Sequence, residues 1–412
     1  MMSVCDHPDL ISVESALAIL LADVSASKTR ENVNVMEADG RVLADDVFSP
    51  MAHPPADNSA MDGYALRGKD LGVQQWFRIS QRILAGDMAT EELEPGCCAR
   101  IMTGAAIPPG ADTVVMQENA ETNDAGWVGF SKLPKIGDNV RLRGEEINQD
   151  DVVLKGGRRL RPADLGLLAG VGIAEVSVKP RLKVALIATG DELCQPGTPL
   201  PDGHIYESNR YTLIPMLKRL GCDVVDMGLV EDELDALRTA FVQADQQADL
   251  VVTTGGVSVG EADFCRTVLD ELGSIDLWRL AIKPGKPFAF GSLPDSRYVG
   301  LPGNPVSAMV TFHQLVVPLI QAMEGETREN QLVLKATLDQ PVRKRPGRMD
   351  FQRGQVYVSE AGELRVRPHK RQGSSLLTTV SQSNAYLLLP RDGGSQEAET
   401  QVSVLMFDRL LN

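Results

Sequence analysis

Two glycines follow a short apolar run at residues 250–252 of this chain. Such a run is typical of one strand of a parallel sheet. It continues into TTGGVSVGEAD, which would put Gly255 and Gly256 at the carboxyl end of the strand, where open α/β sheets bind ligands. Small residues there let backbone N–H groups approach and cradle phosphate oxygens. The stretch therefore indicates a phosphate-binding loop, although a Gly-Gly pair after a strand is also typical of a plain turn.

Charged side chains of both signs follow this glycine loop. Glu261 and Asp263 place carboxylates beside the expected phosphate, an arrangement that repulsion disfavours unless a divalent cation bridges the two. Lys283 and Lys286 stand in the segment KPGKP, where the prolines would hold their positive charges in place. Together these residues favour a phosphorylated ligand bound with a metal ion. Two lysines beside prolines are also typical of a solvated loop.

Two further carboxylates are expected at the same edge of the sheet. Glu192 belongs to TGDE, after the strand expected at residues 182–188, and Asp232 follows the strand that ends at Leu229. With Asp263 they could hold Mg²⁺ against a pyrophosphate. Each also has a plainer interpretation, TGDE as a simple turn and Asp232 as a charge that favours the N-terminus of the next helix.

The segment LPGNPVS opens an apolar run at residues 306–323 that predicts a long helix. Pro305 suits the first turn of a helix. The N-terminus of a helix offers N–H donors and positive potential to an anion, and Ser307 could add a hydroxyl donor. A tight structural turn is expected here whatever the function.

The composition limits the classes of partner. Across 412 residues the formal net charge is −15, which argues against nucleic acid or an anionic membrane as the main partner. KPGKP and the run Arg141-Leu142-Arg143 stand out as basic segments in this acidic background. The six cysteines and five histidines show no zinc-binding spacing. Without a leader pattern or an apolar run of membrane-spanning length, the sequence predicts a soluble, cytoplasmic protein.

Residues 181–327 alternate apolar strands with helices, which predicts a parallel α/β sheet covered on both faces. Gly221 is expected to end the second of these elements, because glycine is favoured just after a helix. The expected strands cover residues 182–188, 223–229, 250–253, 275–281, 288–290 and 298–301, and the expected helices cover 209–220, 234–248, 263–272 and 306–323.

The rest of the chain predicts three further domains. Residues 1–50 and 147–180 are expected to form one discontinuous N-terminal domain, which includes an amphipathic helix at residues 12–24. Short, turn-rich segments predict an inserted β-rich domain at residues 51–146, and period-two patterning predicts a C-terminal β-barrel at residues 328–412. The expected fold class is therefore α/β plus β in four domains.

The motifs of this chain resemble those of the molybdopterin molybdotransferase (molybdenum insertase) family, which includes MoeA and the E domain of gephyrin. The matching segments follow one another along essentially the whole chain: DNSAMDGYA, RIMTGA, RLRGEE, ATGDEL, TTGGVSVGEADF, AIKPGKPFAFG, GLPGNPVSA, DFQRG and QGS. The resemblance implies an elongated four-domain subunit with a central molybdopterin-binding α/β domain. It implies an L-shaped homodimer in which the partner subunit completes each active site, with the N-terminal domain expected to mediate dimerisation.

The resemblance also implies the reaction and the residues that perform it. Such an enzyme inserts molybdenum from molybdate into adenylylated molybdopterin with the help of Mg²⁺, and releases AMP and molybdenum cofactor. The catalytic residues carried over by motif are Asp62, Thr103, Glu192, Asp232, Asp263, Lys283 and Lys286, of which Glu192, Asp232 and Asp263 would hold the metal. The substrate-binding residues carried over are Arg141, Glu146, Gly255, Gly256, Ser258, Pro302, Pro305, Ser307, Arg353 and Ser374. Lys286, Ser307, Arg353 and Ser374 resemble a molybdate pocket, and a tetrahedral dianion favours such fixed cations and hydroxyl donors.

Some points stay open at this stage. Many members of the family carry Asp where this chain has Glu146, and Leu142 replaces a residue that is often basic. The nucleophile would be a molybdate oxygen or a water, oriented by Asp62. Tungstate could replace molybdate, because tetrahedral oxyanions of similar size are hard to discriminate. The molybdopterin adenylyltransferase is a candidate partner that delivers the substrate.

Two other functions compete with this hypothesis. One is ATP-dependent adenylylation of molybdopterin, which single-domain relatives of the α/β domain perform. The other is a scaffold that binds a partner helix without catalysis. Matched residues outside the α/β domain disfavour the first, and the complete set of charged site residues disfavours the second.

Overall fold

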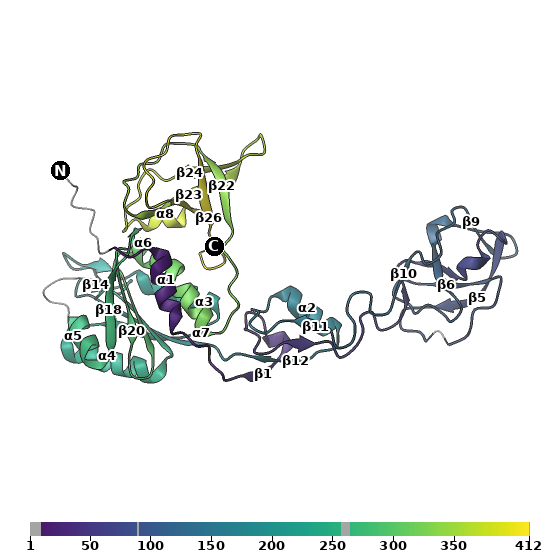
Figure 1. Ribbon diagram of the computed structural model, residues 1–412, viewed down its shortest axis with the longest axis horizontal. Helices are drawn as coiled ribbons and strands as arrows, with labels where there is room; N and C mark the ends of the chain where they lie inside the picture. The colour runs from purple at the N-terminus through teal and green to yellow at the C-terminus, as the bar shows by residue number, and fades with distance from the viewer. Residues whose placement is uncertain (1–9, 89, 257–263, 412) are drawn as a thin grey trace. The chain divides into compact units, whose positions relative to one another are not determined.

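The computed structural model describes residues 10–88, 90–256 and 264–411, and the chain divides into two compact units (Figure 1). The first unit comprises Met1–Glu31, Gly40–Val42 and Lys179–Asn412. The second comprises Asn32–Asp39 and Leu43–Val178. Each unit has hydrophobic clusters of its own, so each is described separately below.

A six-stranded sheet forms the centre of the first unit. Its strands stand in the order β16 (Asp223–Val230), β13 (Lys183–Thr189), β17 (Leu250–Thr254), β21 (Arg297–Leu301), β20 (Pro287–Ser292) and β18 (Ser274–Arg279). The first four strands are parallel, but β20 runs antiparallel to β21 and β18 antiparallel to β20. The prediction of a wholly parallel sheet is therefore wrong for β20 and β18. The loop between β20 and β21 is too short for a crossover, so these strands must form a hairpin.

Alternating side chains of the central strands build a core on each face of the sheet. Val184 and Leu186 face a cluster that includes side chains of α3 (Asn209–Leu220), whereas Ala185 and Ile187 face α4 (Leu234–Gln247) and α5 (Phe264–Leu272). This follows from the two-residue period of a strand. Gly221 ends α3 with a φ of 95°, the left-handed conformation expected of a glycine at a helix C-terminus. The helices on both faces were predicted from the sequence.

The long helix predicted at residues 306–323 is present, with one irregular turn. It consists of α6 (Pro305–Thr311), a π-helical turn at Phe312–Val316 and α7 (Val317–Met323). By length and hydropathy the span Pro305–Met323 could cross a membrane, but 78% of its most apolar window is buried inside the unit. Such burial fits a core helix.

The N-terminal helix α1 (Val13–Ala22) packs in the first unit. Its buried residues Val13, Ala16 and Leu20 join the cluster that contains Leu315 and Ile320 of the long helix. We had grouped this helix with residues 147–180, and that part of the prediction is wrong. An apolar stripe shows that a helix is buried but does not identify the surface that buries it.

A closed β-barrel completes the first unit. It contains β22 (Val333–Leu338), β23 (Met349–Val358), β24 (Leu364–Pro368), β25 (Ala385–Leu389) and β26 (Gln401–Met406), with α8 (Leu377–Ser381) between β24 and β25. Pairing of β23 with both β24 and β25 closes the ring. The short strand β19 (Ile282–Lys283) leaves the α/β part and pairs with β23. This pairing joins KPGKP to the barrel.

The second unit is built from short strands. Its largest sheet has the order β7 (Thr113–Met116), β4 (Gly63–Leu66), β6 (Cys97–Ile101), β5 (Trp76–Ile83), β9 (Val128–Phe130) and β8 (Ala120–Thr122). Three pairs complete the unit: β1 (Glu31–Asn34) with β12 (Glu175–Val178), β2 (Val47–Phe48) with β11 (Val152–Leu154), and β3 (Asn58–Ser59) with β10 (Val140–Arg141). The single α-helix of its described residues is α2 (Pro162–Gly170). Hence residues 32–39 and 43–50 share this unit with residues 147–178.

Candidate active site

The glycine loop lies at the carboxyl end of β17, packed against the end of β13. Gly255 and Gly256 have φ values of 88° and 64°, a conformation that favours glycine. A Cβ atom on Gly255 would lie 2.4 Å from the carbonyl oxygen of Thr189, so this backbone contact also excludes a side chain. Ser258 and Asp263, which we assigned to the same loop, lie outside the described residues.

Carboxylates of two loops meet at this edge of the sheet. Asp191 and Glu192 follow β13, and Asp232 follows β16. The Asp232 N–H donates to Asp191 Oδ1 at 3.3 Å. Burial, and then the charges of Asp191 and Glu192, raise the pKa of Asp232 above its usual value. A bound cation would relieve this repulsion.

These carboxylates form part of the predicted metal site. Within residues 10–88, 90–256 and 264–411, no group of three or more potential ligands is placed to hold a metal ion. The third predicted ligand, Asp263, lies outside those ranges. The metal site therefore stays a prediction, and Asp191 is an additional acidic residue that we had not singled out.

The KPGKP loop packs against the long helix on one side and pairs with the barrel on the other. A Cβ atom on Gly285 would lie 2.4 Å from Thr311 Oγ1, so the loop follows α6 closely. Lys283 stands opposite Asp350 of β23, and its Nζ donates to Asp350 Oδ2 at 3.0 Å. Lys286 is partly buried in the same loop. The two lysines therefore lie beside α6, on a backbone held from both sides.

The first turn of α6 meets a loop from the barrel. Pro305 occupies the start of the helix, and Ser307 is almost fully buried in its first turn. The backbone N–H of Val306 donates to the carbonyl oxygen of Ser374 at 3.0 Å. The structure therefore brings Ser374 to the N-terminus of this helix.

The LPGNPVS segment adjoins the glycine loop. The buried Pro302 and the neighbouring Gly303 begin the LPGNPVS segment, and a Cβ atom on Gly303 would lie 3.8 Å from Gly255 Cα. The side chain of Asn209 donates to the Gly303 carbonyl oxygen at 2.8 Å and anchors the segment to α3. The predicted phosphate loop and the predicted oxyanion loop are therefore neighbours.

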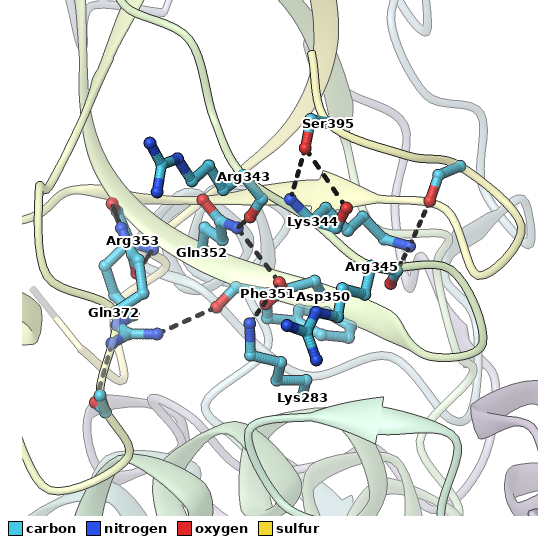
Figure 2. Close-up of polar contacts among 12 residues, drawn as sticks. Lys283, Arg343, Lys344, Arg345, Asp350, Phe351, Gln352, Arg353, Gln372 and Ser395 are labelled. Atoms are coloured by element: carbon cyan, nitrogen blue, oxygen red, sulfur yellow. Dashed lines mark hydrogen bonds and ion pairs between the residues drawn. The ribbon is translucent and has the colours of Figure 1, made fainter. Parts of the chain in front are cut away.

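Arg353 of β23 holds the loop that leads to Ser374 (Figure 2). Its side chain is fully buried, and burial lowers the pKa of the guanidinium. Nε donates to Thr379 Oγ1 at 3.1 Å, and Nη2 donates to the Gly373 carbonyl oxygen at 2.9 Å. Sequence reasoning assigned Arg353 to direct anion binding, but here its donors reach protein oxygens that position the loop. A direct contact with an anion stays a prediction.

The residues predicted in the second unit form a separate group. Thr103 donates to Asp62 Oδ1 from both its backbone N–H and its hydroxyl, each at 2.7 Å. These two bonds lower the pKa of Asp62, so it is a carboxylate at neutral pH. A carboxylate fixed in this way can accept a hydrogen bond but is a poor general acid.

Arg141 and Glu146 belong to the same unit as this pair. Arg141 of β10 stands opposite Asn58 of β3, and its side chain is exposed. Glu146 Oε2 lies 3.6 Å from His53 Nε2. The longer carboxylate of Glu146 therefore has a neighbour in this chain, and its role in substrate binding stays a prediction.

Three family models together match most of the chain. The MoeA N-terminal region (domain I and II) matches residues 11–172, the probable molybdopterin binding domain matches 185–322, and the MoeA C-terminal region (domain IV) matches 335–407. A molybdopterin molybdenumtransferase of Haemophilus influenzae is 43% identical over 403 residues, which is 98% of this chain and 100% of the relative. The chain belongs to the MoeA family.

Other MoeA relatives agree with this assignment. The molybdopterin molybdenumtransferase of Bacillus subtilis is 33% identical over 89% of this chain and 87% of its own length. A solved structure of the molybdopterin biosynthesis MoeA protein of Pyrococcus horikoshii OT3 has a TM-score of 0.82 and 28% identity, and covers 97% of this chain and 100% of that one. The predicted family, the α/β plus β fold class and the transferase class are confirmed.

Proposed function

We propose that this protein inserts molybdenum from molybdate into adenylylated molybdopterin, with Mg²⁺ as the assisting metal and with release of AMP and molybdenum cofactor. A role in molybdenum cofactor biosynthesis follows from the family; the adenylylated substrate, the metal and the released nucleotide are parts of the proposal. The observation that supports it most is the meeting of KPGKP, the first turn of α6 and the Ser374 loop beside the glycine loop. That arrangement offers separate places for a phosphate and for a tetrahedral oxyanion.

In this proposal the residues of the first unit bind and compensate charge. The N–H groups of the glycine loop receive the pyrophosphate, and Ser307, Ser374 and Lys286 receive molybdate. Hydroxyl and ammonium donors suit the oxygens of a tetrahedral dianion. Lys283 shares its charge with Asp350, so Lys286 is the lysine that contributes more to the anion.

The acidic residues at the sheet edge would hold the metal. The raised pKa of Asp232 beside Asp191 and Glu192 fits a place that a divalent cation would stabilise. When bound, Mg²⁺ would supply charge neutralisation for the phosphoanhydride. Asp263 completes this ligand set in the proposal.

Asp62 would orient the nucleophile that attacks phosphorus. Its two hydrogen bonds from Thr103 keep it ionised, so it would accept a hydrogen bond from a water or from a protonated molybdate oxygen. Arg141 and Glu146 would contact the substrate from the same unit. The proposal includes a cytoplasmic homodimer in which the second unit of one subunit completes the site of its partner.

AMP release from purified adenylylated molybdopterin tests this function. With Mg²⁺ present, we expect molybdate to stimulate AMP release and the product to activate an apo-molybdoenzyme. A variant with Lys286→Gln should lose most of the stimulation, whereas Arg328→Gln, an exposed charge outside the site, should not. Absence of AMP release with every divalent metal tested, or a requirement for ATP, would overturn the proposal.

A further inference from the structure

A strongly basic pocket lies on the barrel side of Lys283. It has a volume of about 570 Å³ and is lined by Lys283, residues 343–348, Asp350 and Ser395. The segment 343–348 reads RKRPGR, so four of its six residues are basic in a chain with a net charge of −15. Such a local concentration of positive charge creates an attractive well for anions.

Hydrogen bonds of Lys344 join the wall of this basic pocket to a neighbouring loop (Figure 2). The Lys344 side chain is buried, and its Nζ donates to the carbonyl oxygens of Arg391 at 3.1 Å and Gly393 at 2.7 Å. Its backbone N–H donates to Ser395 Oγ at 3.1 Å. Lys344 is thus a clamp between two loops rather than a ligand-binding group.

The burial of Lys344 determines the direction in which the neighbouring arginine side chains point. In an extended segment, residues on either side of a buried residue point to the opposite face. Arg343 and Arg345 are accordingly exposed while Lys344 is buried, and the Pro346-Gly347 turn brings Arg348 to the same pocket. Arginines on a preorganised segment lose less freedom when they bind a ligand.

Carboxylates of the described residues do not neutralise the three arginines. Asp350 is the single carboxylate that lines the pocket, and its Oδ2 already accepts from Lys283 and from Gln352. Within the described part of the chain, no carboxylate forms an ion pair with Arg343, Arg345 or Arg348. The pocket therefore has a net positive charge even with Asp350 ionised.

One more observation extends this basic surface. A second pocket of about 380 Å³ shares Lys283 and Arg343 with the first and extends to Gln372, beside the Gly373–Ser374 loop. The basic surface therefore continues to the edge of the candidate oxyanion site.

We propose that the basic pocket of Arg343, Arg345 and Arg348 is a second anion site, which binds the phosphate group of a phosphorylated small molecule. Arginine forks match phosphate oxygens in bidentate geometry, and three arginines together attract a doubly charged phosphate more strongly than a singly charged carboxylate. The site is separate from the oxyanion site at Ser307 and Ser374. It does not depend on the insertion reaction, and its ligand is either AMP or a phosphate monoester without a nucleoside.

Calorimetric titration of the full-length protein with inorganic phosphate tests this site. The triple variant Arg343→Gln, Arg345→Gln, Arg348→Gln should bind phosphate at least about tenfold more weakly than the wild type. The matched control Lys183→Gln, Arg328→Gln, Lys335→Gln removes the same charge from exposed positions elsewhere in the unit. It should stay within about twofold of the wild type, since distant exposed charges are screened.

Further titrants separate the possible ligands. If AMP binds more tightly than inorganic phosphate and adenosine binds weakly, the ligand is the nucleotide. If AMP and inorganic phosphate bind with equal affinity, the ligand is a phosphate monoester without a nucleoside. Molybdate should bind the triple variant as tightly as the wild type.

Three results would overturn the proposal: no phosphate binding to the wild type, equal losses in the triple variant and the control, or a parallel loss of molybdate affinity in the triple variant. Unchanged unfolding temperatures would show that the variants fold. If the triple variant does not fold, the single variant Arg345→Gln takes its place in the titration.

Discussion

Arg353 in the first unit and Asp62 in the second were assigned to the site by the same kind of motif, yet their surroundings are opposite. Arg353 is fully buried, and its donors reach Thr379 and the Gly373 carbonyl oxygen. Asp62 is partly exposed and is held by the single residue Thr103. The first residue is part of a core, and the second stands on a loop.

This difference predicts how stability and activity separate. Residues such as Arg353 build the site through packing, so their loss should lower the stability of the first unit together with its activity. Residues such as Asp62 should affect activity with little change in stability. A variant whose changes in stability and activity do not follow this division would contradict it.

Replacement of Arg353 should have the largest effect. Arg353→Ala leaves buried acceptors without donors and opens a cavity, so we expect the unfolding temperature to fall by about 5–10 °C. Molybdate-dependent AMP release should be lost as well, and differential scanning calorimetry beside the activity assay measures both. Arg328→Gln is the control. An unchanged unfolding temperature with complete loss of activity would show that Arg353 acts by touching the substrate instead.

Asp62→Asn should have a large effect on activity alone. Asn keeps an acceptor for Thr103 but removes the charge that orients a nucleophile, so AMP release should slow by about 100-fold. Substrate binding, measured by equilibrium titration, should change by less than about threefold, because the group acts mainly on the transition state. If binding and AMP release fell equally, Asp62 would be a binding residue.

Asp232→Asn should have a small effect on stability, in the direction opposite to that of Arg353→Ala. A carboxyl with a raised folded pKa binds protons more tightly in the folded state, so its favourable contribution is present at low pH and is lost as the pH rises through that pKa. At pH 7 the variant should therefore unfold about 1–3 °C higher than the wild type.

The same variant should also respond less to added metal than the wild type. Added Mg²⁺ should raise the unfolding temperature of the wild type, because a ligand that binds the folded state stabilises it. The increase should be smaller for Asp232→Asn. Equal increases in both proteins would place the metal elsewhere.

Much of the fold was predictable because local patterns determine it. The boundaries of α3 follow from the apolar period and from Gly221, and the glycine loop follows from the strand before it. The position of α1 was not predictable in this way, because it depends on which distant surface buries the helix. The direction of β20 was predictable from the short connection to β21, which leaves no room for a crossover.

The site was predictable as a set of residues but not as a set of roles. The motifs gave Arg353 and Lys283, but they did not show that Arg353 is fully buried or that Lys283 pairs with Asp350. The RKRPGR segment was not singled out from the sequence, and the burial of Lys344 depends on carbonyl groups some fifty residues away. Tertiary contacts decide these roles, and sequence spacing does not record them.

The location of bound molybdate tests the oxyanion site most directly. A crystal structure of the protein soaked in molybdate, with anomalous scattering from molybdenum, would reveal the ion independently of activity. We expect the molybdenum signal at the first turn of α6, within hydrogen-bond reach of Ser307, Ser374 and Lys286. A signal that appeared only in the basic pocket, or only beside Asp62, would contradict this assignment.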